Sequence, residues 1–449
     1  MRQYITELSK YIIAVLMVLY TLGSLWSLFD RERRKSVVYL LQNLLMFVIQ
    51  IFMFIDLALI NAEMEYVFFY VFVQIFLLAV VIIVPMIYEE ANRLLLNHMC
   101  MLLGIGLCVI SRLSFRSAIK QYIIVLVSLA VSLFIPWVLS RIRFLKKLTW
   151  AYGLVGASLL TMVFVLGEIT HGSKISLSIG SISFQPSEFV KILFVFFLAG
   201  MLWEKADFWR VAMTAVIAGI HVILLVVSKD LGGALIFFIS YVFVVFLATG
   251  NYLYLLAGAL GGSGAAWAAY QLFGHVRTRV LAWKDPWTYI DDQGYAVTQS
   301  LFAIGSDNWF GMGLSQGDPK AIPYVEMDFA FSAICEELGV IFGICVILLY
   351  FVCFLEMLRM AILIRDRFYQ LIVCGIGMMY IFQIFLTIGG GIKLIPLTGV
   401  TLPFISYGGS SVMTTMIMFF LIQGIYIRLR QEGARQSGGK TKQSGKKQT

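Results

Sequence analysis

The chain alternates between long apolar blocks and short charged connectors along nearly its whole length. A transmembrane helix needs about 20 consecutive, predominantly apolar residues, and most of the blocks reach that length. The pattern therefore predicts an all-α polytopic membrane protein with about thirteen spans. They fall near residues 11–29, 37–59, 66–87, 94–111, 119–139, 150–168, 189–203, 208–228, 231–249, 252–273, 328–358, 367–390 and 401–427.

The composition agrees with this class. Hydrophobic residues make up 60% of the chain and charged residues 13%, whereas a soluble domain carries about 25% charged residues. The net charge of +9 does not indicate a nucleic-acid partner, because the basic residues gather in connectors and in the tail, as they do on the cytoplasmic side of membrane proteins. The six cysteines lie in apolar blocks without a CxxC pair, which predicts buried thiols rather than disulfides or a metal site.

The basic connectors predict the orientation of the chain. Residues 31–35, 141–147, 359–367 and the tail from 428 all carry clustered Lys and Arg, and the count of spans places all four on one side, the cytoplasm. The N-terminus and the long polar segment 274–327 then lie outside. Arg112, Arg116 and Lys120 disagree, because they would also lie outside. Either the number of spans predicted before this connector is wrong, or these charges face an anionic ligand or headgroup.

The polar segment 274–327 is much longer than an ordinary connector, and long loops of this kind are usually functional. It places Asp328 on the first turn of the next apolar helix, with Ser332 and Glu336 on the same face and Glu336 about 12 Å further along the axis. Glu337 is a second acid within this span, and intramembrane acids are functional candidates. The helix dipole would lower the pKa of Asp328, so burial or an anionic substrate must offset it if Asp328 acts as a base.

Three further segments place polar residues beside apolar spans. Glu188 and Lys191 are spaced to pair on one helix face, and a structural ion pair and a ligand contact are equally good interpretations. Asp230 precedes a helix in a turn, where a capping role is favoured. Segment 389–411, GGGIKLIPLTGVTLPFISYGGSS, predicts a broken helix that lines a cavity, and Lys393 within it is a credible partner for a phosphate or an acid.

Several motifs together resemble the SEDS family, which includes RodA, FtsW and SpoVE. They occur in the family's order between residues 93 and 428 and read FQPSE with Lys191, DLGGA, GYAVTQSLFAIG, DFAFSAICEELG and IPLTGVTLPFISYGGSS. The resemblance implies an N-terminal transmembrane extension of about three spans (1–92) and a ten-span SEDS-like core (93–428) with the large extracytoplasmic loop 274–327. The polar, basic and low-complexity composition of residues 429–449 predicts a disordered cytoplasmic tail. The chain departs from many members at Glu326-Met327, which stand where those members have His-Thr.

The resemblance implies a peptidoglycan glycosyltransferase of the bacterial cytoplasmic membrane that polymerises lipid II on the outer face, beside a class B penicillin-binding protein. Asp328 would be the catalytic base that deprotonates the acceptor hydroxyl, while basic groups stabilise the departing pyrophosphate. Whether a divalent cation such as Mg or Mn takes part is open. Candidates for substrate contact are Glu188, Lys191, Asp230, Arg277, Arg279, Tyr295, Gln299, Ser300, Glu336, Glu337, Lys393, Ser406 and Tyr407.

Two hypotheses from other classes compete with catalysis. A flippase for lipid-linked sugars would also need a polar cavity, but it should place its key charges near mid-membrane on paired broken helices. A non-catalytic scaffold for division or sporulation would not need Asp328 or the C-terminal motif. The sequence leaves open the choice among elongation, division and sporulation, the cognate transpeptidase, the oligomeric state and the function of the first three spans.

Overall fold

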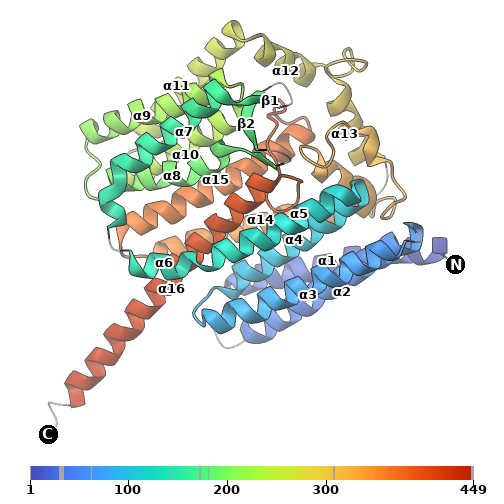
Figure 1. Ribbon diagram of the computed structural model, residues 1–449, viewed down its shortest axis with the longest axis horizontal. Helices are drawn as coiled ribbons and strands as arrows, with labels where there is room; N and C mark the ends of the chain where they lie inside the picture. The colour runs from blue at the N-terminus through green and yellow to red at the C-terminus, as the bar shows by residue number, and fades with distance from the viewer. Residues whose placement is uncertain are drawn as a thin grey trace.

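The computed structural model describes residues 2–29, 35–61, 63–142, 144–170, 173–179, 182–306 and 309–445. It is a bundle of long helices (Figure 1). The helices are α1 (Arg2–Phe29), α2 (Lys35–Asn61), α3 (Met64–Ile87), α4 (Arg93–Leu113), α5 (Phe115–Leu133), α6 (Ile135–Arg141), α7 (Thr149–Leu166), α8 (Pro186–Leu202), α9 (Phe208–Val227), α10 (Leu231–Thr249), α11 (Leu253–Leu272), α12 (Gly274–Lys284), α13 (Tyr295–Gly305), α14 (Ala330–Leu363), α15 (Arg367–Gly391) and α16 (Gly409–Gly445).

The predicted class, an all-α polytopic membrane protein, is confirmed. Among the described residues, eleven helices or helix pairs are long and apolar enough to cross a membrane. Two further helices occupy predicted spans: α8, which has 17 residues, and the Gly- and Ala-rich α11, which has 20. Between α7 and α8 the chain forms a small antiparallel sheet in the order β1-β2-β3, which the sequence pattern did not predict. Its strands are β1 (Glu168–Thr170), β2 (Ser173–Ile179) and β3 (Ile182–Phe184).

Three predicted spans differ from the structure in detail. The span expected at 119–139 is broken into α5 and α6, and Pro136 lies in the first turn of α6, where its missing N–H does no harm. The last span was expected from 401, but α16 begins only at Gly409, because the Gly- and Pro-containing stretch before it folds as an irregular connector. The helix expected from 328 begins at Ala330 and is kinked at Gly339, whose φ of 90° is open to glycine.

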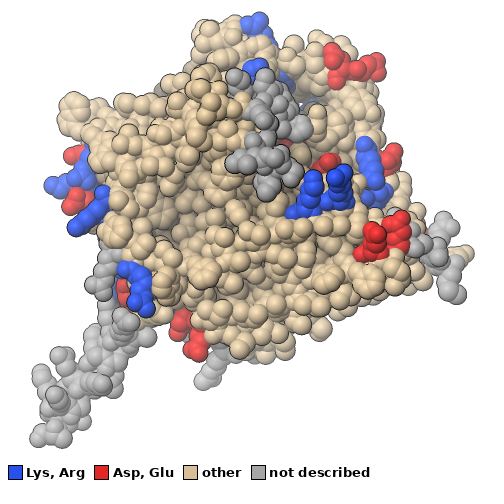
Figure 2. All heavy atoms as spheres, viewed as in Figure 1, with Lys and Arg blue, Asp and Glu red and all other residues tan. Residues whose placement is uncertain are grey.

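The basic connectors meet at one end of the bundle, as the predicted orientation requires. Lys146, between α6 and α7, pairs with Asp366, between α14 and α15, at 2.8 Å. Arg428 on α16 donates to the Tyr369 hydroxyl at 2.7 Å, and Arg359 on α14 donates to a carbonyl at the end of α1. In Figure 2 the charged residues on the visible face lie mostly toward its edges, and the broad middle is largely uncharged, as expected for a lipid-facing belt.

Helices α1, α2 and α3 form a layer that packs on α4, α5 and α14 (Figure 1). As a result α4 is buried continuously from Leu94 to Ser111. Polar contacts cross this seam: the Tyr20 hydroxyl lies 3.1 Å from His98 Nδ1, and Asn97 donates to Gln42 at 3.3 Å. The three extra spans are therefore part of one packed body with the core helices that they cover.

The tail from 429, expected to be disordered, continues α16 as a helix to Gly445, and residues 446–449 lie outside the described residues. The apolar part of α16 supplies the costly helix nucleus, and each added residue then gains a backbone hydrogen bond. Arg428 and Glu432 also pair at 3.0 Å with i,i+4 spacing, which supports the first turn beyond the span.

Candidate active site

The irregular connector between α15 and α16, residues 392–408, is the element on which the site is built. Its first part is exposed at Ile392 and Leu394, but its second part lies within the protein: Leu402, Phe404 and Ile405 are each at most 1% exposed. Non-helical backbone at this depth is tolerated only where protein surrounds it or where it lines a cavity. The broken helix predicted for segment 389–411 is therefore confirmed.

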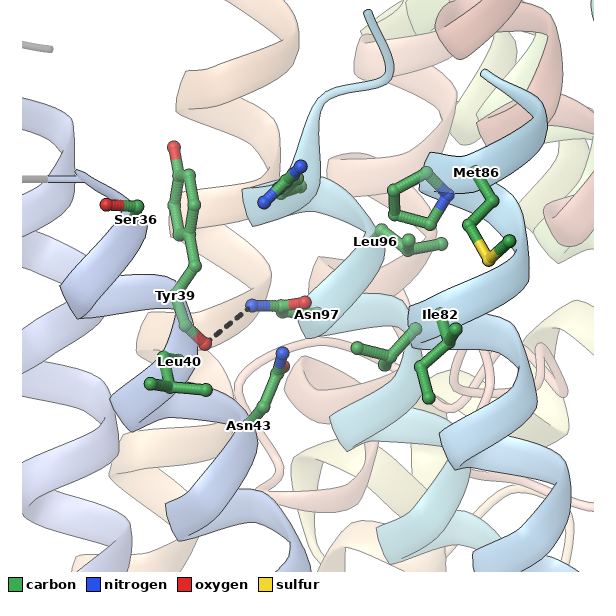
Figure 3. Close-up of a pocket in the computed structure, with 11 residues that line it drawn as sticks. Ser36, Tyr39, Leu40, Asn43, Ile82, Met86, Leu96 and Asn97 are labelled. Carbon is green, nitrogen blue, oxygen red and sulfur yellow. Dashed lines mark hydrogen bonds between the residues drawn. The ribbon is translucent and has the colours of Figure 1, made fainter. Parts of the chain in front are cut away.

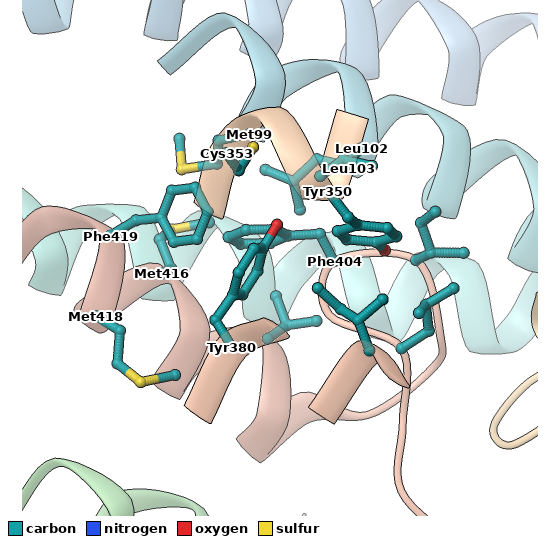
Figure 4. Close-up of a cluster of buried hydrophobic side chains, with 14 of the residues drawn as sticks. Met99, Leu102, Leu103, Tyr350, Cys353, Tyr380, Phe404, Met416, Met418 and Phe419 are labelled. Carbon is teal, nitrogen blue, oxygen red and sulfur yellow. The ribbon is translucent and has the colours of Figure 1, made fainter. Parts of the chain in front are cut away.

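Phe404 anchors this connector in the core. Its ring lies among Tyr350, Tyr380 and Phe419 (Figure 4), with a centroid distance of 4.9 Å to Phe419. Its φ is 65°, an uncommon conformation for a bulky residue. Gly106 on α4 makes room for it, because a Cβ there would lie 2.3 Å from the Phe404 carbonyl oxygen. Close packing thus holds the connector in one position.

The connector in turn holds the segment that carries Asp328. The Ser406 hydroxyl donates to the Met327 carbonyl, and the Tyr407 amide donates to the Glu326 carbonyl at 2.7 Å. The Asp328 amide donates to the Tyr324 carbonyl at 3.1 Å, which closes a turn. Asp328 therefore lies in this turn, two residues before α14, and not on the first turn of the helix as predicted. Ser406 and Tyr407 position the acid through the backbone.

Asp328 and Arg279 face the same point beside Gly399. A Cβ built on Gly399 would lie 3.9 Å from both Asp328 Oδ2 and Arg279 Nη2. Arg279 comes from α12 in the long loop segment, and its Nη1 donates to the Leu397 carbonyl at 3.0 Å. Gly399 has a φ of 74°, so the absence of a side chain both permits the turn and leaves this space open.

Burial raises the pKa of Asp328 to about 6, while Arg279 opposes the shift. The effect expected of the helix dipole is therefore outweighed by burial, because charge is costly away from water. Burial also lowers the pKa of Arg279, although Asp328 and Asp230 favour its charged form. Near neutral pH the site holds a carboxylate that is mostly ionised but is more basic than an exposed Asp.

A polar cavity of about 50 Å³ opens beside Gly399. Lys191, only 2% exposed, donates to Glu188 at 2.7 Å and to Gln383 at 2.8 Å. The second carboxylate oxygen of Glu188 has no hydrogen-bond partner among the described residues. Asp230 caps α10 through the Gly233 amide at 2.8 Å, as the capping interpretation predicted, and it also lines the cavity. Burial raises the pKa of Asp230.

Gly399 belongs to this cavity and also touches the Asp328–Arg279 pair. The structure therefore brings two groups of candidates together at the connector: Asp328 with Arg279, and Glu188, Lys191 and Asp230 in the cavity. An acid that can accept a proton lies beside cations that can bind an anion.

Other candidates have structural contacts away from this point. Glu337 pairs with Arg112 at 3.0 Å, and Glu336 accepts from the Asp318 amide at 2.8 Å. Glu336 thus fastens the long loop to α14, and Glu337 joins α14 to α4. Arg112, one of the three basic residues that disagreed with the predicted orientation, thus faces an acid of its own chain rather than a ligand or a headgroup. Arg277 donates to carbonyls at the end of α11 and is exposed.

The remaining candidates lie where the long loop meets α14 and α15. Ser300 is buried, lies 2.6 Å from the Ser332 hydroxyl and donates to the Gly391 carbonyl at 2.8 Å. It joins three helices and has a packing role. Lys393 has a φ of 60°, and its carbonyl accepts from Trp283. Gln299 is half-buried and Tyr295 is exposed, both on α13.

Gln383 is a site residue that the sequence analysis did not single out. It receives the Lys191 ammonium and donates to the Thr401 carbonyl at 2.9 Å. It therefore connects the cavity to the connector. An amide in the middle of the apolar helix α15 was the available signal, because such a group needs a partner inside the protein.

The residues around Asp328 do not fit a divalent cation. Within the described part of the chain, no three His, Cys, Asp or Glu side chains converge to hold a metal ion, and the cation that faces Asp328 is Arg279. Mg²⁺ and Mn²⁺ prefer several oxygen ligands. We therefore assign no step to a metal.

Comparison with known proteins identifies relatives of this chain. Residues 92–431 match the FtsW, RodA and SpoVE family, described as "Cell cycle protein". The peptidoglycan glycosyltransferase RodA of Mycobacterium leprae is 33% identical over 360 residues, which cover 74% of this chain and 77% of that protein. Stage V sporulation protein E of Bacillus subtilis is 33% identical over 282 residues, covering 60% and 76%.

Solved structures share the fold. One from a study of how a peptidoglycan synthase complex coordinates polymerization and crosslinking has a TM-score of 0.65 and 24% identity, covering 76% of this chain and 99% of that chain. The rod shape determining protein RodA of Thermus thermophilus has a TM-score of 0.57 and 22% identity, covering 75% and 96%. At these identities the likeness concerns the architecture.

Proposed function

The chain belongs to the FtsW, RodA and SpoVE family, and on that basis we propose that it is a peptidoglycan glycosyltransferase that polymerises lipid II. The observation that carries the proposal is the half-buried Asp328 beside Arg279. The connector next to this pair also lines a cavity that contains charged side chains. The names of the relatives support the reaction class, and the site supports the role of each residue.

In the proposed reaction Asp328 accepts the proton of the acceptor sugar hydroxyl. The acceptor oxygen then attacks the anomeric carbon of the donor sugar, and the bond from that carbon to the pyrophosphate oxygen breaks. The electron pair leaves with the pyrophosphate, and the configuration at the anomeric carbon is inverted. One carboxylate suffices because the leaving group is already activated, unlike that of a glycoside hydrolase.

Arg279 has two roles in this scheme. Its charge holds the pKa of Asp328 below the value that burial alone would give, which keeps the base ionised. It also faces the space beside Gly399, where it can stabilise the negative charge that develops on the pyrophosphate. Lys191 and Asp230, which line the cavity beside Gly399, are candidates to bind polar groups of the acceptor substrate.

We place the reaction on the extracytoplasmic face of the bacterial cytoplasmic membrane. The basic connectors gather at the opposite end of the bundle from Asp328, and basic loops mark the cytoplasm. A class B penicillin-binding protein is the proposed partner. Its support is the similarity in fold to a chain from a peptidoglycan synthase complex, and adding such a protein to the polymerisation assay tests it.

Replacement of the base is the decisive experiment. Asp328→Asn keeps the size of the side chain but cannot accept the proton, so polymerisation of lipid II by the purified protein should fall about 10²–10⁴-fold. Asp328→Glu should retain little activity, because misplacement by about 1 Å can cost 10²-fold. The products are measured as glycan strands on a gel. Asp291→Asn, an exposed loop acid, is the matched control and should be close to wild type.

Glycan strands of normal length and yield from Asp328→Asn would contradict the mechanism. A flippase would behave differently, because its substrate would cross the bilayer without a new glycosidic bond. A scaffold would give no strands even in the wild-type protein. The same assay therefore separates all three functions.

A further inference from the structure

A second and larger cavity lies far from Asp328, where the N-terminal layer meets the core. Its volume is about 430 Å³, and its walls come from α2, α3 and the start of α4 (Figure 3). Protein interiors contain few voids larger than a water molecule, whereas ligand pockets measure about 300–1,000 Å³. A space of this size at a helix seam is a candidate binding site.

One side of this seam cavity is polar. Arg93 lines it, and the guanidinium of Arg93 forms no ion pair or hydrogen bond within the described part of the chain. The carbonyl-type oxygen of Asn43, Oδ1, is buried without a partner among the described residues. Asn97 donates to the Tyr39 carbonyl at 3.4 Å (Figure 3). The Tyr39 hydroxyl is directed away from Asn97, toward the end of α2 that carries Ser36. A cation, a phenol and an amide thus face one space.

The other side is apolar and opens outward. Leu40 is 71% exposed and Met86 is 73% exposed, and both line the cavity mouth. On transmembrane helices such side chains lie in hydrocarbon. The seam cavity therefore connects a charged, polar wall with the acyl region of a bilayer.

This combination fits an amphipathic anion. Arginine binds phosphate in a charge-assisted, often bidentate manner, and Tyr is suited to the membrane interface. The cavity lies where α2 begins, α3 ends and α4 begins, since Ser36, Met86 and Arg93 line it. The sequence just before Ser36 is Arg-Glu-Arg-Arg-Lys, which assigns that end to the cytoplasm. The cytoplasmic leaflet carries anionic lipids, and basic pockets between helices on that side bind their headgroups.

We propose that the seam cavity binds one anionic glycerophospholipid of the cytoplasmic leaflet. The phosphate lies against Arg93 and the Tyr39 hydroxyl, a hydroxyl or amine of the headgroup donates to Asn43 Oδ1, and an acyl chain lies across Leu40 and Met86. A free phosphate would leave the apolar wall unused, and a neutral lipid would leave Arg93 without a counter-charge. This inference is independent of the proposed catalytic function.

The site also gives the N-terminal layer a mechanical role. Arg93 follows Asn92, whose side-chain amide donates to Glu356 on α14 at 2.7 Å and whose backbone amide donates to Gln423 Oε1 on α16 at 2.8 Å. A lipid held by Tyr39 and Arg93 therefore bridges α2 to the part of α4 that is tied into the core. Binding to the folded state alone stabilises it by mass action.

The test uses the purified full chain in nanodiscs of phosphatidylcholine, with or without phosphatidylglycerol. Native mass spectrometry measures the lipid retained, and thermal unfolding measures the consequence. Wild type should retain phosphatidylglycerol in preference to phosphatidylcholine and unfold at a higher temperature with it. Arg93→Gln should lose about tenfold in retention, as expected for one charge-assisted contact. Arg93 is exposed, so this change should not impair folding.

Arg141→Gln is the matched control, because Arg141 is an exposed arginine at the same end of the bundle outside the cavity, and it should retain the lipid. Asn43→Leu should weaken retention while leaving the charge in place. Equal retention by Arg93→Gln and wild type would overturn the proposal, as would equal binding of phosphatidylcholine. Displacement of the lipid by inorganic phosphate at comparable concentration would also overturn it, because the site would then recognise phosphate alone.

Discussion

Asp328 and Arg279 face one point beside Gly399, so the ionisation of the acid is coupled to the charge of the arginine. Burial raises the pKa of Asp328 to about 6, and the arginine opposes this shift. The proton-accepting form of the carboxylate therefore dominates above this pH and is lost below it. This residue-scale balance should be visible in the pH dependence of polymerisation.

The rate of lipid II polymerisation at limiting substrate should fall about tenfold per pH unit below about pH 6 and level off above pH 7. Arg279→Gln removes the charge that lowers the pKa of Asp328, so its acidic limb should move to higher pH and the plateau should fall. Rates measured across pH 5 to 8 test this. An acidic limb at the same pH in both proteins would show that Arg279 does not act on Asp328.

The buried pair Glu188–Lys191 gives a second residue-scale prediction. Lys191→Met leaves Glu188 charged and without its partner, which should cost about 3–5 kcal/mol of folding free energy. Adding Glu188→Gln removes the stranded charge and should restore most of the unfolding temperature. Activity that stays lost in the double variant would assign the pair a role in the reaction. A fully stable and active Lys191→Met protein would contradict both roles.

At the scale of elements, the connector 392–408 transmits core packing to the site. Phe404 is buried among aromatic rings, and Ser406, two residues later, holds the segment that carries Asp328. Irregular backbone has few internal hydrogen bonds, so side-chain anchors determine its position. The connector should therefore be sensitive to changes that lie far from any substrate.

Phe404→Ala should lower the free energy of unfolding by about 3–5 kcal/mol, because it leaves a cavity in the core. It should also lower polymerisation by more than the folded fraction explains, since a shift of about 1 Å at the acid can cost 10²-fold. Phe385→Ala, on α15 and 44% exposed, is the matched control and should have little effect. Normal specific activity in the folded Phe404→Ala protein would show that the packing of the connector does not position Asp328.

At the scale of the whole molecule, the salt bridge Lys146–Asp366 and the Arg428–Tyr369 contact gather the basic connectors at one end. The exposed acids Asp291 and Asp318 belong instead to the long loop that leads to Asp328. This separation of charge gives the molecule a defined orientation in the membrane.

Single cysteines at Asp291 and Asp318 should react with an impermeant thiol reagent added to intact cells, and a cysteine at Ser437 should react only after the membrane is opened. The six native cysteines are buried and should give little background. Equal labelling at all three positions in intact cells would contradict the orientation and would move the proposed reaction away from the outer face.

The sequence by itself determined the class of the protein, most of its spans and several local features of the site. Apolar blocks long enough to cross a bilayer are a local property, because the bilayer rather than a distant segment supplies their environment. The pairing of Glu188 with Lys191 depends only on helical spacing. The irregular connector follows from its Gly and Pro content, and Asp328 was found because an acid beside an apolar span is conspicuous.

Only the tertiary structure decided which polar residues meet. Glu336 and Glu337 were expected near the substrate, but Glu336 fastens the loop and Glu337 pairs with Arg112 on α4. Arg279 reaches Gly399 across more than a hundred residues, whereas Arg277, two residues away, faces the end of α11. Such contacts depend on how helices rotate and cross when they pack. The pKa of Asp328 has the same origin, because burial is a property of the assembled fold rather than of the local sequence.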